Sequence, residues 1–103
     1  MPFINTKYFK ERLLKEKERV LKNIEEINAD LARIASEDEI NDLEDMAELE
    51  IENERDKAIL KALNLELKEI NEKIKKINEG RYGVDENGNP ISLLKLLKNP
   101  LLG

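Results

Sequence analysis

Residues 60–77 read LKALNLELKEINEKIKKI, with an apolar residue at alternating steps of three and four positions. Such spacing puts the apolar side chains on one stripe of an α-helix, which is typical of a helix that packs against another helix. Traced toward the N-terminus, the alternation passes Asn53 and Leu49 and reaches Met46, so we predict a long helix. The apolar members of the stripe after Asn53 are Leu60, Leu63, Leu67, Ile70, Ile74 and Ile77.

A second apolar stripe lies nearer the N-terminus, from Phe9 to Ile34, with Lys17 at one of its positions. Between the stripes, residues 35–42 read ASEDEIND, and short polar side chains of this kind bond to the backbone and favour a turn. Because the connection is short, we expect the two helices to lie antiparallel and to bury their stripes against each other. The sequence therefore predicts an all-α fold built on a long antiparallel coiled-coil hairpin. The apolar members of this second stripe are Phe9, Leu13, Val20, Ile24, Ile27, Leu31 and Ile34.

Two features of the hairpin are polar. If residues pair around the centre of the turn, Lys17 lies near residues 56–60 and Asn53 lies near Ile24, so polar groups interrupt the middle of the seam. We interpret them as specifying the register, because a polar seam residue disfavours alternative pairings. The cap of the second helix stays open between a capping box and a single polar residue. The candidates are Ser36 with Glu39 for the box, and Asn41 or Asp42 for the single cap.

Charge is segregated along the chain. The first 22 residues carry a run of lysines and arginines, whereas residues 37–56 hold eleven acids and the single base Arg55. Acids in the first turn of a helix suit its dipole. We therefore expect a hairpin of residues 1–79 with an acidic tip near residues 36–47.

The C-terminal part reads as a different module. The helical period breaks at residues 78–80 (NEG), where a glycine can end a helix in the left-handed conformation. Turn-forming residues at 85–90 predict one or two tight turns or a small hairpin, and a short helix is expected over 92–99. We expect residues 80–103 to form a tail whose leucines pack on the base of the hairpin. These leucines are Leu93, Leu94, Leu96, Leu97, Leu101 and Leu102.

The composition excludes several kinds of site and partner. There is no Cys and no His, so a thiolate zinc site and a disulfide are impossible and the commonest general base is absent. A net charge of −5 and an aromatic content of 4% are unlike a surface that holds nucleic acid by phosphate contacts and base stacking. We therefore expect no metal, no cofactor and no direct sequence-specific binding of nucleic acid.

The expected location is the cytoplasm. The sequence shows no basic-then-apolar signal pattern, and no apolar run approaches the roughly 18 residues that span a bilayer. We expect no membrane contact and a monomer rather than a dimer, although the apolar tail could also pack against a second copy. No enzymatic activity is expected, because an exposed hairpin end lacks the enclosure that tunes carboxylates for acid–base work.

Two separate parts of the chain resemble the DksA/TraR family. The first is Asp42-Leu43-Glu44-Asp45-Met46-Ala47, of the form Asp-x-x-Asp-x-Ala. The second is similar to the family pattern Gly-x-Tyr-Gly-x-Cys-x-x-Cys-Gly-x-Pro-Ile followed by Arg-Leu and Pro. Its counterparts here are residues 80–84 (GRYGV), 88–91 (GNPI), Lys95-Leu96 and Pro100.

The sequence departs from the family pattern at the zinc finger. Asp85 stands where the first zinc cysteine would be, the loop is one residue short, and the chain ends before the last two cysteines. We predict a degenerate, metal-free zinc-finger region, in which Asp85, Glu86 and Asn87 form a turn rather than a hard-metal site. Lys95 replaces the usual Arg, which keeps the charge and loses the planar fork.

The resemblance implies a transcription regulator that inserts its coiled coil into the secondary channel of bacterial RNA polymerase. In this reading Asp45, with Asp42 beside it and the small Ala47, faces the polymerase active centre. Arg81, Lys95 and Leu96 would dock the tail on the polymerase or brace the hairpin. The alarmone ppGpp often acts with family members, and the basic N-terminal residues could contribute to its site.

Two alternatives stay open. One is a structural or adaptor coiled coil, in which the acidic segment is a solvated helix face. The other is a GreA-like transcript cleavage factor, which also has an acidic-tipped coiled coil but carries a second, sheet-rich domain that this sequence lacks.

Overall fold

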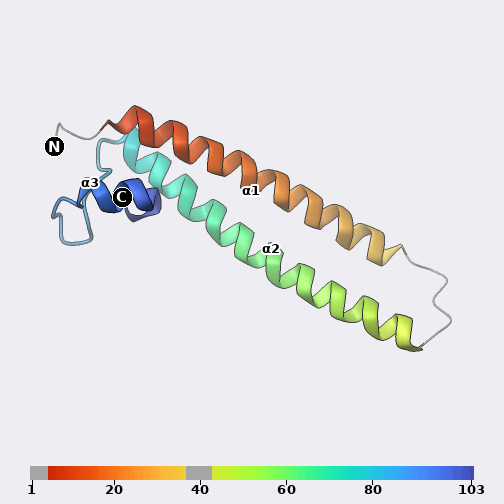
Figure 1. Cartoon of the computed structure of the whole chain (residues 1–103). Coiled ribbons are helices and arrows are strands. Elements are labelled where there is room, and N and C mark those ends of the chain that lie inside the picture. The colour runs from red at the N-terminus through yellow and green to blue at the C-terminus, as the bar shows by residue number, and fades with distance from the viewer. Residues whose placement is uncertain (1–4, 37–42) are drawn as a thin grey trace. The chain divides into compact units, whose positions relative to one another are not determined.

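The computed structural model describes residues 5–36 and 43–103. Its elements are α1 (Thr6–Ala35), α2 (Leu43–Asn78), α3 (Leu93–Lys98) and the 3-10 helix η1 (Pro100–Leu102) (Figure 1). Within these residues, β-structure is confined to an isolated antiparallel bridge between Val84 and Pro90. The predicted all-α fold is confirmed, and the small hairpin expected in the tail is present as this single bridge.

The chain divides into two compact units. The first unit contains the residues up to Arg19 together with Leu67–Gly103, and the second unit is Val20–Glu66. These units are groups of residues that contact one another, whereas the predicted boundary at residue 79 divides the chain by its order in sequence.

Polar contacts inside each unit show that α1 and α2 run antiparallel. In the first unit, Lys10 Nζ donates to Asn78 Oδ1 at 2.8 Å, which joins the start of α1 to the end of α2. In the second unit, Arg33 Nη2 donates to Glu52 Oε1 at 2.7 Å. The end of α1 therefore meets the early part of α2, as the short connection predicts.

Each unit has a small apolar core that comes mostly from the predicted stripes. Burial of a Leu, Ile, Val or Phe side chain stabilises a fold by about 1.5–3 kcal/mol, so a few such residues account for much of the pairing energy. The buried apolar residues are Phe9, Leu13, Ile70, Tyr82 and Leu96 in the first unit, and Val20 and Leu63 in the second.

Side chains bond to the backbone at both ends of α1. The Tyr8 backbone N–H donates to Asn5 Oδ1 at 3.1 Å, so Asn5 caps the start of the helix. At the other end, Ser36 Oγ donates to the Arg33 carbonyl at 2.8 Å. Ser36 thus bonds to the end of α1, and the other proposed caps of α2 (Glu39, Asn41 and Asp42) lie outside the described residues.

The ends of α2 follow the charge and turn chemistry of its sequence. Glu44 and Asp45 lie in its first turn, and Lys75 and Lys76 in its last, so both ends complement the helix dipole. After the helix, Gly80 adopts a φ of +72°, which a residue with a side chain rarely does. The Gly80 N–H donates to the Ile77 carbonyl at 3.1 Å and the Arg81 N–H to the Lys76 carbonyl at 2.8 Å. This is a Schellman motif, and it confirms the predicted helix end.

The tail buries fewer leucines than predicted. Leu96 is 0% exposed, whereas Leu94 is 71% exposed and Leu101 is half-buried. The remaining exposed leucines are Leu93, Leu97 and Leu102. The expectation that all six pack internally is wrong, because α3 buries only Leu96 and the 3-10 helix η1 leaves Leu102 exposed.

Among the described helices, none is both long enough and apolar enough to cross a membrane.

Leu96→Ala is expected to lower the free energy of unfolding by about 2–5 kcal/mol, because it removes a fully buried side chain and leaves a cavity. The matched control is Leu94→Ala in the same helix, which should change stability by no more than about 0.5 kcal/mol because that side chain is exposed. Urea unfolding of the whole chain, followed by circular dichroism, measures both. Equal effects of the two substitutions would contradict the placement of α3.

Candidate functional site

The first candidate region is the acidic start of α2. Asp45 and Ala47 lie in its first turns and are exposed, while Asp42, the other predicted tip carboxylate, lies outside the described residues. Positions two apart on a helix do not share a face, so Asp45 and Ala47 offer a carboxylate and a small surface on different sides. Leu43 and Met46 beside them are also exposed. This end of the helix therefore offers negative charge together with apolar surface.

The second candidate region is the tail, which Tyr82 anchors. Its hydroxyl donates to the Pro100 carbonyl at 2.6 Å, and its ring lies 5.6 Å from that of Phe9 between centroids. Burial raises the pKa of Tyr82 to about 12, and the positive charge of Arg12 opposes this rise. The hydroxyl is therefore a neutral donor at physiological pH, and it ties η1 to α1 through the tyrosine ring.

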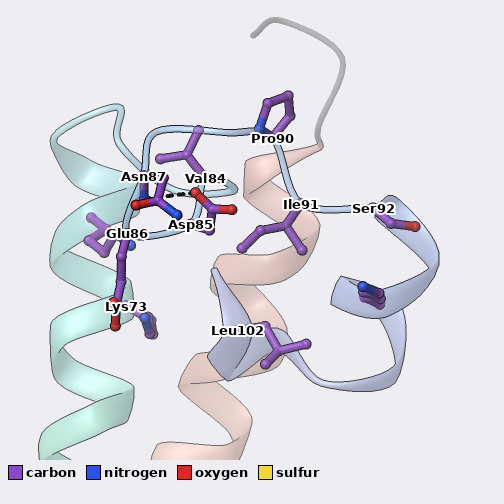
Figure 2. A pocket seen from close by; sticks show the side chains of 11 residues that line it. Lys73, Val84, Asp85, Glu86, Asn87, Pro90, Ile91, Ser92 and Leu102 are labelled. Atoms are coloured by element: carbon purple, nitrogen blue, oxygen red, sulfur yellow. Dashed lines mark hydrogen bonds between the residues drawn. The ribbon is translucent and has the colours of Figure 1, made fainter.

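The Asp85 carboxylate closes the turn that stands in place of the zinc finger. Its Oδ1 accepts the backbone N–H groups of Asn87 and Asn89, each at 2.9 Å. The Asp85 N–H donates to the Asn89 carbonyl at 2.8 Å, and the Ile91 N–H to the Gly83 carbonyl at 2.8 Å. Figure 2 shows Asp85 directed at Asn87 across this turn. The Asp85 side chain is thus occupied with the backbone of its own turn.

A pocket of about 600 Å³ lies in the first unit beside this turn (Figure 2). Lys73, Lys76 and Lys95 line it together with the Asp85 turn. Burial lowers the pKa of Lys76, and the nearby positive charges of Lys73 and Arg81 lower it further. Lys76 Nζ also donates to a Gly103 oxygen. The acids Asp85 and Glu86 also line the pocket, so the positive charge of its three lysines is partly balanced there.

The structure separates the three predicted tail residues into two kinds. Leu96 is fully buried, so its side chain braces the tail. Lys95 is exposed and lines the pocket, and Arg81 is exposed and pairs with Glu79 at 2.9 Å.

Sequence reasoning missed a cluster of carboxylates in the second unit. Asp30 of α1 and Glu52 and Asp56 of α2 come together, and Asp56 is buried. The available signal was the stripe itself: after Asn53, the alternation of three and four reaches position 56 before Leu60. Asp56 therefore occupies a seam position. An interpretation that considers only apolar residues does not detect it.

Two long helices joined by a short connection, with a turn-rich tail, define a helical-hairpin protein. The fold is similar to the structure of transcription factor DksA2 from Pseudomonas aeruginosa, with a TM-score of 0.83 and 25% sequence identity over 93% of this chain and 73% of that one. The chain therefore has a DksA-like fold, with a zinc-finger region that lacks cysteines. Comparison of the sequence with protein-family models and with curated proteins finds no match.

Tyr82→Phe is expected to lower stability by about 1–3 kcal/mol at neutral pH, because the buried Pro100 carbonyl loses its donor. The pKa of Tyr82 is raised from 10.0 to about 12 in the folded chain. Its contribution is therefore complete below pH 10 and is lost as the pH rises toward 12, because only the unfolded chain ionises readily there.

Thermal unfolding at several pH values between 8 and about 11.5 tests this expectation. The intact protein should lose stability more steeply than Tyr82→Phe above pH 10, and Tyr8→Phe, at an exposed tyrosine, is the control. Parallel curves for the intact protein and Tyr82→Phe would show that Tyr82 is not buried as described.

Proposed function

We propose that this protein is a DksA-type transcription regulator that binds bacterial RNA polymerase. The observation that carries the proposal is the similarity of its fold to transcription factor DksA2 over 93% of the chain. The Asp-x-x-Asp-x-Ala motif at the start of α2 supports it, because an acidic helix end matches what the DksA/TraR resemblance places in the polymerase channel.

In this proposal the acidic end of α2 enters the secondary channel. Asp45, with Asp42 beside it, faces the polymerase active centre and alters the stability of the promoter complex during initiation, and the small side chain of Ala47 permits close approach. Exposed Asp45 and Glu44 lie at the start of a helix whose next residues are also rich in acids, which favours a basic partner surface. The protein itself catalyses no reaction.

The tail serves as the second contact in the proposal. Leu96 braces it from inside. Lys95 and Arg81 are exposed and are proposed to meet an acidic surface of polymerase, Arg81 in exchange for its pair with Glu79. The exposed side chains of Leu93, Leu94 and Leu97 on α3 add apolar area, which is enriched in the core of protein interfaces.

If the protein uses ppGpp, the basic N-terminal residues are proposed to contribute to its site, because phosphate groups bind well to clusters of positive charge. We propose that the protein acts as a cytoplasmic monomer.

The proposal is tested with purified protein and its host's core RNA polymerase. The intact protein should bind and change the lifetime of promoter open complexes. Asp42→Ala/Asp45→Ala should bind with affinity weakened by no more than about 30-fold, because each of two surface ion pairs contributes about 1 kcal/mol at most, and should lose the effect on lifetime.

Glu69→Ala/Glu72→Ala is the matched control, since it removes two exposed acids from a later part of α2. This control should retain the effect on open complexes. If the intact protein fails to bind polymerase, a structural or adaptor coiled coil becomes the better interpretation. If it binds and stimulates transcript cleavage, the GreA-like alternative gains support.

A further inference from the structure

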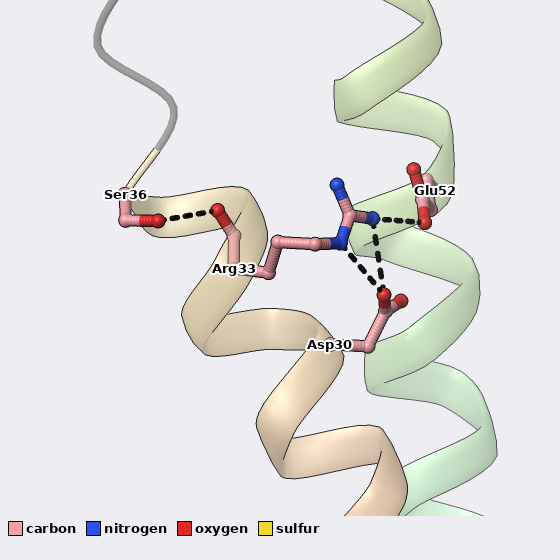
Figure 3. A network of polar contacts seen from close by, with 4 residues as sticks. All are labelled: Asp30, Arg33, Ser36 and Glu52. Carbon is pink, nitrogen blue, oxygen red and sulfur yellow. Dashed lines mark hydrogen bonds and ion pairs between the residues drawn. The ribbon is translucent and has the colours of Figure 1, made fainter.

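Three carboxylates meet between the two helices of the second unit. Asp30 extends from α1, and Glu52 and Asp56 extend from α2, four positions apart on that helix. One oxygen from each lies within 4.8 Å of the others. Figure 3 shows Asp30 and Glu52 directed toward each other from the facing helices, with Arg33 between them. Groups that repel one another are thus held together by the pairing of α1 with α2.

Asp56 separates this cluster from an ordinary group of surface acids. Asp56 is only 3% exposed, and its Oδ2 atom is buried without a hydrogen-bond partner. A buried carboxylate oxygen that lacks a donor is strongly unfavourable, since it has lost water and gained nothing in return. An ionised Asp56 therefore lacks a partner in this arrangement, and either a proton or a cation would supply one.

Arg33 supplies only part of the positive charge that the cluster needs. Its Nε and Nη2 donate to Asp30 Oδ1 at 3.2 and 3.0 Å, and Nη2 also donates to Glu52 Oε1 at 2.7 Å. Three carboxylates with one guanidinium leave two negative charges in excess when all are ionised. A divalent cation would balance that excess.

The pKa values of Asp30 and Asp56 also indicate that the cluster lacks positive charge. Interaction with the Asp30 carboxyl group, followed by burial, raises the pKa of Asp56, and Arg55 opposes the rise as the weakest influence. The interaction with Asp56, aided by Arg33, lowers the pKa of Asp30. One carboxyl group therefore tends to keep a proton beside an ionised one, where a cation could replace the proton.

We propose that Asp30, Glu52 and Asp56 form a binding site for one hard divalent cation, which links α1 to α2 within the second unit. The ligands are all carboxylate oxygens, which favours Ca²⁺, Mn²⁺ or Mg²⁺ over zinc or copper. One oxygen from each carboxylate lies within 4.8 Å of the others, so a small movement of the side chains would bring all three onto one cation.

The test uses the full chain, stripped with a chelator and unfolded by heat in the presence of CaCl₂, MnCl₂ or MgCl₂. NaCl keeps the ionic strength constant, so that general screening does not contribute. Because the cation binds only the folded chain, we expect a saturable rise in Tm of roughly 5–10 °C with at least one of the three cations.

Asp56→Asn is the main variant, since the amide keeps the shape and removes the buried charge. It should unfold at a higher temperature than the intact protein without cation, and its Tm should not respond to cation. Glu52→Gln should also lose the response, whereas Glu69→Gln, an exposed acid elsewhere on α2, should keep it.

The absence of a saturable Tm shift with all three cations would overturn the proposal and leave the proton as the partner of Asp56. An equal shift in Asp56→Asn and in the intact protein would also overturn it, because the ion would then act on surface acids in general. The measurement involves no polymerase, so its outcome is separate from that of the proposed function.

Discussion

The pairing of two apolar stripes is the constraint on which the rest of this structure depends. Neither α1 nor α2 can bury its stripe alone, and an isolated amphipathic helix has little stability in water. Phe9 and Leu13 on α1 and Ile70 on α2 are almost fully buried in the first unit, and Val20 and Leu63 in the second. The acidic start of α2, the lysine pocket and the carboxylate cluster all occupy positions that this pairing sets.

The two units use different means to hold α1 against α2. The first combines aromatic and aliphatic burial with the anchored tail. In the second, Ile24, Ile27 and Leu31 are only half-buried, Met46 is exposed, and Asp56 takes a seam position. Apolar burial is therefore weaker there, and the ion pair of Arg33 with Glu52 joins the two helices. The first unit should depend mainly on packing, and the second more on the charge state of its carboxylates.

Periodicity predicted the helices and most of the core because apolar burial repeats with the helix turn, as Phe9, Leu13 and Ile70 show. The break at Gly80 was predictable as well, since its conformation favours glycine. The burial of Asp56 was not predictable, because the identity of an acidic residue does not show whether it is buried or solvated. The burial of Leu96 alone among the tail leucines depends on how a six-residue helix meets its neighbours, which spacing does not specify.

The tail shows how a zinc-finger-like segment can hold its form without cysteines. In a zinc site, metal–ligand bonds supply folding energy and fix the loops. Here the Asp85 carboxylate fixes the turn through two backbone N–H groups, and the Tyr82 hydroxyl ties it to Pro100. Leu96 provides the apolar anchor. Each contact is weaker than a metal bond, but together they act on both ends of the segment. They leave Lys95 and the lysine pocket on an ordered surface, which is what a docking role would require.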